Sequence, residues 1–220
     1  MQRHVDLELS QLKDELVRMA SLAETAIGLA VKALVSRDAE LARQVIASDE
    51  AINLLEVDID ERCLRIMALY QPEARDLRFL AMALKINNDL ERMGDQAVNI
   101  SERALDLLKE PLLKPLIDIP RMAEIAQRMV KDSLDAFVQQ DVDKARAVCR
   151  QDDEVDRYDD QIFRELLSDM MEDPKAVTRA VQLILVSRHI ERIADHATNI
   201  AEDVYYLVRG TTIKHHLAGE

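Results

Sequence analysis

Apolar residues recur at spacings of three and four along most of the chain, which is the period of one face of an α-helix. In the first segment this pattern predicts a helix from about Val5 to Val35. A stripe of this length predicts a helix that packs one face into a core. The residues of the stripe are Leu9, Leu12, Leu16, Met19, Ala20, Ala23, Ile27 and Ala30.

Capping and breaking residues divide the pattern that follows. Asp38 is a suitable N-cap for a second helix, and Gln71-Pro72 predicts its end and the start of a third, with Pro72 at the first helical position. The third helix is predicted to run to about Lys109. The second helix carries its own apolar stripe: Leu41, Val45, Ile52, Leu55, Ile59 and Ile66.

A proline-rich segment from Glu110 to Arg121 is the only strong break in the helical pattern. It contains Pro111, Pro115 and Pro120, and clustered prolines mark loops between helices. We therefore divide the chain into residues 1–112 and 113–220.

The second part repeats the first. Helix four is predicted over about 120–139, Asp141 caps helix five as Asp38 caps helix two, and Asp173-Pro174 begins helix six. The segment LERMGDQAVNISE (90–102) matches IERIADHATNIAE (190–202) at Glu, Arg, Asp, Ala, Asn, Ile and Glu. The sequence thus predicts an all-α protein of six long helices, built as two tandem three-helix bundles by internal duplication, with antiparallel neighbours.

The composition agrees with helix packing and excludes several functions. Hydrophobic residues make up 48% of the chain but aromatic residues only 3%, so Leu, Ile, Val, Ala and Met must fill the core. Four glycines are too few for a dinucleotide-binding or P-loop phosphate cradle. The net charge of −13 repels phosphate backbones and anionic lipids. We therefore expect no nucleic acid as partner, no direct membrane insertion and no direct sensing of phosphate.

The N-terminal residues, the lack of a long apolar stretch and the cysteines predict a cytoplasmic protein. The first residues are charged throughout, unlike a signal peptide, and no stretch approaches 18 uninterrupted apolar residues. Cys63 and Cys149 lie far apart without a CxxC or Cys/His pattern, so they predict neither a disulfide framework nor a zinc site. We expect both thiols to be buried in a reducing compartment.

Acidic residues form a repeated stripe within the matching segments. The pattern E-x3-D-x3-N-x2-E places its side chains on one helix face, next to the apolar stripe. The stripe therefore flanks the core. It comprises Glu91, Asp95, Asn99 and Glu102, and again Glu191, Asp195, Asn199 and Glu202.

Antiparallel hairpins bring further acids level with this stripe. Residues equidistant from the turn lie side by side, so Asp49 faces Asp95 and Asn53 faces Glu91; in the second half Asp152 faces Asp195 and Asp156 faces Glu191. With axes roughly 8–10 Å apart, several carboxyl groups gather at one point. A hard cation such as Mg, Ca, Mn or Fe would relieve their repulsion. The predicted metal ligands are Glu91, Asp95, Glu191, Asp195, Asp49, Asp152 and Asp156.

An acidic face in solvent, balanced by Arg92, Arg188 and Arg192, is the alternative interpretation of this stripe. His189 and His196 lie nearby, and we interpret them as surface histidines because the first half has Asp89 and Gln96 in their places. The nine Met residues are interpreted as core filler, and Gly94 as a position of close helix packing. No nucleophile stands beside a base, so we expect no catalytic residue.

The segments LERMGDQAVNISERA and RHIERIADHATNIAEDV resemble the PhoU family, the accessory proteins of phosphate-specific transport. The resemblance covers nearly the whole chain, including QPEARDLRFLAMALKINNDLERMGDQAVNI. It implies a cytoplasmic, non-enzymatic negative regulator of phosphate uptake and of the phosphate-starvation response. The implied partners are a sensor histidine kinase and the ATPase subunit of the ABC phosphate transporter, and the implied state is a homodimer.

The resemblance also implies metal ions, iron or zinc clusters or another divalent cation, bound through the E-x3-D motifs at Glu91, Asp95, Glu191 and Asp195. Asn53 departs from full carboxylate content, which predicts a weaker first site. Two rival functions remain open. A carboxylate-bridged metal enzyme in a helical bundle needs Glu-x-x-His pairs, and no Glu or Asp here precedes a His by three. A purely structural scaffold would bind no metal.

Overall fold

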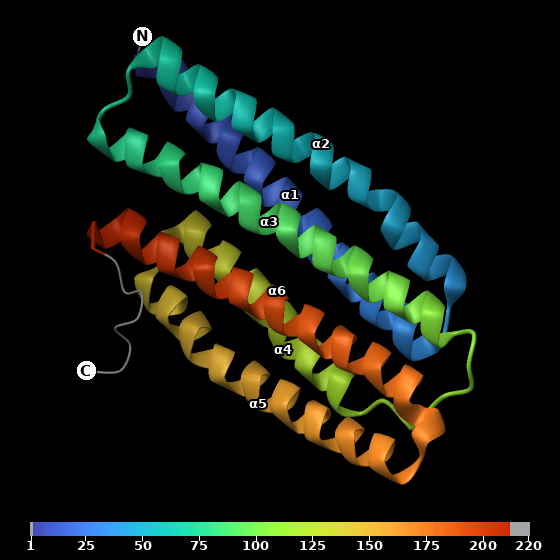
Figure 1. Ribbon diagram of the computed structural model, residues 1–220. Coiled ribbons are helices and arrows are strands. Elements are labelled where there is room, and N and C mark those ends of the chain that lie inside the picture. Colours follow the sequence, from blue (N-terminus) through green and yellow to red (C-terminus); the bar gives the residue numbers. More distant parts are fainter. Residues whose placement is uncertain (1, 212–220) are drawn as a thin grey trace.

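The computed structural model describes residues 2–211 and consists there of long helices joined by short connections (Figure 1). The first three helices form one bundle and the last three form another. A short 3-10 turn, η1, precedes the last helix. The elements are α1 (Gln2–Ser36), α2 (Ala39–Tyr70), α3 (Ala74–Leu107), α4 (Asp118–Gln139), α5 (Val142–Glu172), η1 (Pro174–Ala176) and α6 (Val177–Arg209).

Two predicted aspartate caps are confirmed. The Asp38 carboxylate accepts hydrogen bonds from the backbone amides of Glu40 and Leu41, at 2.9 and 3.1 Å. Asp141 does the same for the first amides of α5, at 3.0 Å. The residues that end α1 and α4, Arg37 and Gln140, have φ values of 56° and 55°. This left-handed conformation reverses the chain within two residues at both turns.

The prediction for Pro72 was wrong by two residues. Gln71 adopts a left-handed conformation with φ of 46° and ends α2, so Pro72 lies in the connection and α3 begins at Ala74. In the second half, Pro174 is the first residue of η1, where the Asp173 carboxylate accepts from the Lys175 amide at 2.9 Å. The proline thus begins a helical turn in only one of the two repeats.

The two bundles pack along α3 and α6, which run antiparallel through the middle of the molecule, while α1 also contacts α4 (Figure 1). The predicted all-α fold of two tandem three-helix bundles is confirmed. Its apolar stripes meet in one continuous core that extends through both bundles. Met19, Met93, Met122 and Met129 are fully buried there, as the interpretation of methionine as core filler predicts, but Met171 is 80% exposed and does not follow it.

The apolar composition of α1 is explained by this packing. One stretch, His4–Ser36, is long and apolar enough to cross a membrane by length and composition alone, with a mean hydropathy of 1.4 over 18 residues. Half of that window is buried inside the protein, and α1 packs against α2, α3 and α4. Its apolar face is therefore a core face of the bundle.

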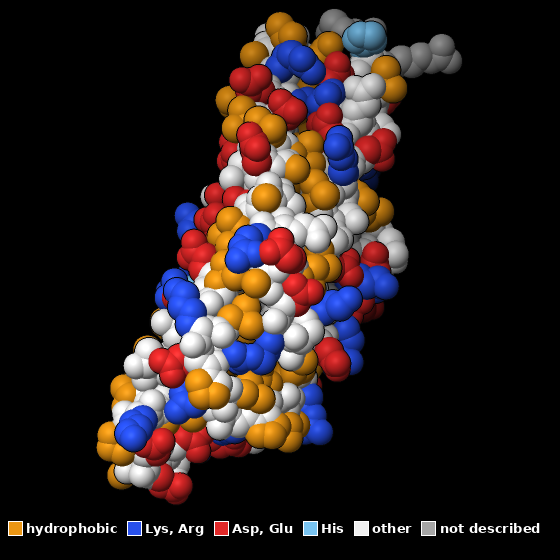
Figure 2. Space-filling view, turned by 90° about the vertical axis from the view of Figure 1, so that its right-hand side faces the viewer, with side chains coloured by type: hydrophobic (Ala, Val, Ile, Leu, Met, Phe, Trp, Pro, Cys, Tyr) orange, Lys and Arg blue, Asp and Glu red, His pale blue; other side chains and the backbone are white. Residues whose placement is uncertain are grey.

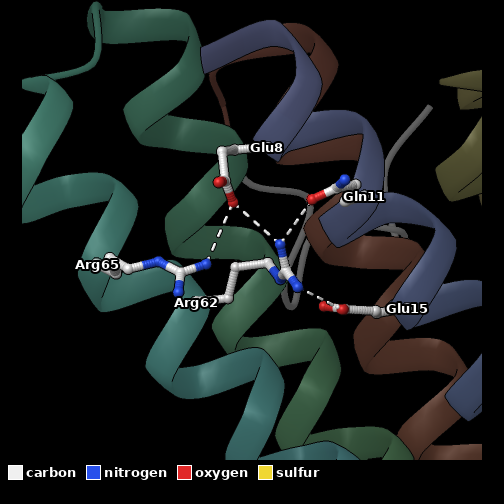
Figure 3. Close-up of polar contacts among 5 residues, drawn as sticks. All are labelled: Glu8, Gln11, Glu15, Arg62 and Arg65. Carbon is white, nitrogen blue, oxygen red and sulfur yellow. Dashed lines mark hydrogen bonds and ion pairs between the residues drawn. The ribbon is translucent and has the colours of Figure 1, made fainter. Parts of the chain in front are cut away.

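Polar contacts fix α1 against α2 at the outer edge of the first bundle (Figure 3). The Arg62 guanidinium of α2 donates to Glu8 at 3.0 Å, to Gln11 at 2.9 Å and to Glu15 at 2.8 Å, and Arg65 also reaches Glu8. One arginine thus binds three successive turns of its neighbour, which sets the register of the two helices.

Candidate functional site: two acidic clusters

Each α-hairpin brings acidic side chains of two helices together, as the spacing predicts. We call Asp49, Glu56, Glu91 and Asp95, from α2 and α3, the first acidic cluster. The second acidic cluster comprises Asp152, Asp156, Asp159, Glu191 and Asp195, from α5 and α6.

In the first acidic cluster, α2 and α3 approach closely because Gly94 has no side chain. A Cβ at this position would lie 3.0 Å from Ile52 Cδ1 and 3.2 Å from Asp49 Oδ1. Asp49 is therefore pressed against α3, where its Oδ2 accepts from Asn53 Nδ2 at 2.8 Å and its buried Oδ1 has no hydrogen-bond partner. The interpretation of Gly94 as a close packing position is confirmed.

Burial and mutual repulsion perturb these carboxyl groups. Burial raises the pKa of Asp49, and the charge of Asp95 raises it further, against the lowering effect of the Asn53 hydrogen bond. Burial is also the main cause of the raised pKa of Glu91, followed by the charges of Asp95 and Glu56. These groups are thus close enough to repel one another, as the hairpin geometry predicts.

The second acidic cluster is the more strongly perturbed. Burial, with the charges of Asp156 and Asp195, raises the pKa of Asp152 to about 7. Burial is the largest cause of the raised pKa of Asp156, Glu191 and Asp195 as well. All four carboxyl groups that the sequence predicts as ligands in this half therefore lie in one electrostatic environment.

Two members of the clusters were missed from the sequence. Glu56 and Asp159 raise the pKa of Glu91 and Glu191 respectively, and they occupy equivalent places in the two repeats. Asp159 is buried, forms an ion pair with Arg188 at 2.9 Å, and keeps its Oδ1 without a hydrogen-bond partner. The signal was available, because each follows Asn53 or Asp156 by three residues and so continues the same helix face.

The donor chemistry of both clusters fits a hard cation. The side chains offer carboxylate oxygens, which Mg, Ca, Mn and Fe accept as ligands, and no His or Cys belongs to either cluster. Among residues 2–211, however, no group of three His, Cys, Asp or Glu converges in the arrangement that holds a metal ion. The alternative interpretation, an acidic face balanced by arginines, is also supported. Arg188 forms an ion pair with Asp159, and the charges of Arg92 and Arg192 lower the pKa of Glu91 and of Asp195 respectively.

The interpretation of His189 and His196 as surface histidines was wrong. Both are partly buried between α3 and α6, where His196 Nδ1 lies 2.8 Å from Asp89 Oδ1 and His189 Nδ1 lies 2.9 Å from Gln96 Oε1. Asp89 and Gln96 are the first-half equivalents of these histidines, so each histidine pairs with the counterpart of the other. The two repeats thus differ at these positions in a complementary way, because each histidine of the second repeat bonds to a polar residue of the first across the pseudo-two-fold axis that relates them. Burial lowers the pKa of His189 to about 4.

The PhoU domain model matches this chain twice, at residues 16–104 and 119–204, once in each bundle. The chain is 50% identical over 208 residues to the phosphate-specific transport system accessory protein PhoU homolog of Aquifex aeolicus, covering 94% of both chains. It is 43% identical over 209 residues to the homolog of the same name from Pseudomonas aeruginosa, covering 94% of this chain and 86% of the relative.

Solved structures agree with the sequence matches. The crystal structure of PhoU from Pseudomonas aeruginosa superposes with a TM-score of 0.91 at 42% identity, covering 94% of this chain and 99% of that one. The phosphate transport system regulatory protein PhoU from Streptococcus pneumoniae superposes with a TM-score of 0.88 at 32% identity, covering 94% and 98%. In both repeats and in the fold that they build, this chain belongs to the PhoU family.

Proposed function

We propose that this protein is a negative regulator of phosphate uptake and of the phosphate-starvation response. It acts as a cytoplasmic, homodimeric adaptor between the ATPase subunit of the ABC phosphate transporter and a sensor histidine kinase. The observation that carries this proposal is the identity, 50% over 94% of the chain, with a phosphate-specific transport system accessory protein. A protein that is bound by several partners requires exposed helix faces, which both bundles offer.

The protein performs this role without catalysis. Burial raises the pKa of Cys63 to about 12 and that of Cys149 to about 11, so both remain unreactive thiols at neutral pH. The hydroxyls of Ser101, Ser133 and Ser187 donate to carbonyls of their own helices, so none of the three donates to a side-chain base. These observations support a binding function.

The two acidic clusters are the proposed cation sites. Asp49, Glu91 and Asp95 would bind through carboxylate oxygens in the first bundle; Asp152, Asp156, Glu191 and Asp195 would do so in the second. A bound cation supplies positive charge that offsets the repulsion behind the raised pKa values. Because the clusters contain no sulfur or imidazole, their donors favour iron, manganese, magnesium or calcium over zinc.

The two acidic clusters determine the local charge that the outer helix faces offer to a partner. On the face seen in Figure 2, acidic and basic side chains are interspersed with hydrophobic ones, so the net charge of −13 is not spread as a uniform acidic field. The clusters are instead local concentrations of negative charge on the α2–α3 and α5–α6 faces. Basic patches of a partner would dock there, and cation occupancy would change the local charge.

Co-purification tests the adaptor proposal. Replacing Glu91, Asp95, Glu191 and Asp195 by Ala should abolish capture of the kinase and the transporter ATPase from cells grown with ample phosphate. The matched control replaces four exposed carboxylates outside the clusters, Asp14, Asp58, Glu124 and Glu172, and should retain both partners. Elemental analysis of chelator-free protein should find a metal in the wild type and in the control only. Unchanged capture and regulation by the first variant would refute the role of the clusters.

A further inference from the structure

A cleft of about 520 Å³ opens where the two repeats meet, at the end of the molecule that holds the start of α3. It lies outside both acidic clusters. Residues of α1, of α3, of the α4–α5 turn and of the end of α6 line it. They include Ser10, Lys13, Arg75, Arg78, Phe79 and Gln140.

Three cationic side chains in the lining indicate which kind of ligand the cleft would accept. Lys13, Arg75 and Arg78 form no ion pair with any residue in the described part of the chain. Lys13 Nζ lies 5.1 Å from the centre of the Phe79 ring, and the Arg78 guanidinium 5.8 Å from that of Tyr206. Aromatic rings hold these two cations while their hydrogen-bond donors stay available. Two carboxylates, Asp6 and Asp76, also line the cleft but do not pair with the three cations.

The first two turns of α3 line one side of the cleft with Arg75, Asp76, Arg78 and Phe79. The N-cap of α3, Glu73, makes no capping hydrogen bond with its side chain, so the first-turn amides lack the partner that Asp38 and Asp141 supply elsewhere. Arg75 Nη2 reaches Gln140 Oε1 at 3.4 Å, which links the first repeat to the second across the cleft.

The internal duplication provides a control for this cleft. At the opposite end of the molecule the connection between the repeats, residues 108–117, takes the place of the first turns of α1, and the corresponding cavity measures only about 10 Å³. Leu113 and Leu116 stand there where the open cleft has Ser10 and Lys13. One end is thus filled by apolar side chains and by Arg37, whose guanidinium donates to backbone carbonyls of the connection. The other end is open and lined by hydroxyl, ammonium and guanidinium groups.

We propose that this cleft binds a small phosphate-type oxyanion, free or carried on a small organic molecule, through Arg75, Arg78 and Lys13. Two guanidinium groups match the paired oxygens of a phosphoryl group, and the volume lies in the range of small-molecule sites. Leu9, Phe79 and Leu207 offer an apolar wall to an attached organic group. The overall charge of −13 predicted no direct sensing of phosphate, but local charge and not net charge decides a site.

Thermal shift and calorimetry test this site with inorganic phosphate, pyrophosphate and adenosine monophosphate, at an ionic strength held constant with sodium chloride. At least one of the three should raise the Tm of the wild type as its concentration rises. A response to the first two alone identifies an inorganic ligand; a stronger response to the nucleotide identifies a phosphorylated organic one. Arg75→Gln and Arg78→Gln should each weaken binding by roughly tenfold or more.

Three further variants separate specific binding from effects on folding and on the acidic clusters. Arg146 lies over the ring of Tyr205 at 5.2 Å, as Arg78 lies over Tyr206, but outside the cleft; Arg146→Gln should bind as the wild type does. The double variant Ser10→Leu/Lys13→Leu introduces the leucines that occupy the corresponding places at the filled end. It should keep or raise the Tm of the ligand-free protein, but its Tm should no longer rise with the phosphate probes. Asp152→Ala should leave binding intact, which separates this site from a cation-mediated one. The proposal falls if no probe exceeds the chloride control, or if Arg146→Gln loses as much binding as Arg78→Gln.

Discussion

At the scale of single residues, burial decides how the acidic side chains behave. Asp152 and Glu191 have raised pKa values chiefly because they are partly removed from water, and their acidic neighbours add to the effect. Asp106, which is hydrogen-bonded to Lys109, has a lowered pKa instead. Identical side chains thus differ in proton affinity according to what surrounds them.

Asp152→Asn is expected to stabilise the metal-free protein at pH 8 and to change little at pH 4.5. The folded carboxyl group has a pKa of about 7 against an ordinary value of 3.8, so the folded state binds more protons between these values and loses stability as pH rises through that window. The gain at pH 8 should be on the order of 1–2 kcal/mol once solvent screening is taken into account. Denaturant unfolding at both pH values measures it. An equal gain in the free energy of unfolding at both pH values would contradict the raised pKa of Asp152.

His189→Gln is expected to flatten the acid limb of the stability curve. The pKa of His189 is lowered from 6.5 to about 4, so the unfolded state binds the extra proton between these values and wild-type stability falls as pH decreases through them. Glutamine can still bond to Gln96 but does not titrate. Unfolding free energies measured from pH 7.5 to 4.5 should therefore fall less for this variant than for the wild type. His4→Gln changes an exposed histidine and should follow the wild type throughout.

At the scale of helices, the short connections between α1 and α2 and between α4 and α5 follow one design. A left-handed residue ends one helix, and the next residue, Asp38 or Asp141, caps the following one. Both parts are local, since they depend on residues within a few positions of one another. This explains why the starts of α2 and α5 could be predicted, whereas the start of α3, whose N-cap has no side-chain bond, was misplaced.

Asp38→Ala is expected to lower the free energy of unfolding by about 1 kcal/mol, because two amides of the first turn of α2 lose their acceptor. For a chain of this size that corresponds to roughly 2–4 °C in Tm. Asp14→Ala removes an exposed carboxylate within α1 and should change the Tm by much less. A cap contribution is ruled out if both substitutions have the same effect.

At the scale of the whole molecule, the two repeats share one core. The α3–α6 contact joins them along their length, and polar contacts such as His196 to Asp89 and Lys85 to Asp203, at 2.8 and 2.7 Å, cross it. The core residues of both bundles form a single cluster. Each repeat therefore completes the burial of the other.

We expect the repeats to unfold in one cooperative transition. Ile52→Ala, a substitution at a fully buried position of the first bundle, should lower the hydrogen-exchange protection of the slowest amides in α5 and α6 as much as in α2. Exchange measured by mass spectrometry resolves the two bundles. Loss of protection confined to the first bundle would show that the repeats unfold separately.

The sequence alone determined the helices, the duplication and the facing acids within each hairpin. The period of apolar residues, the aspartate caps and the symmetry of an antiparallel hairpin are all rules that act between near neighbours in sequence or across one turn. The spacing from the turn was therefore enough to place Asp49 near Asp95, and Asp152 near Asp195. The cation that we propose for these acids follows from their chemistry and stays a prediction.

Only the tertiary structure decided how the bundles dock. The partners of His189 and His196, and the cleft around Arg75 and Arg78, depend on which faces of α3 and α6 meet. The histidine contacts join residues about a hundred positions apart, and their geometry is set by side-chain packing across the interface. No spacing within one repeat determines which faces of α3 and α6 meet. The repeat pattern therefore assigned two histidines to the surface that lie partly buried between the bundles.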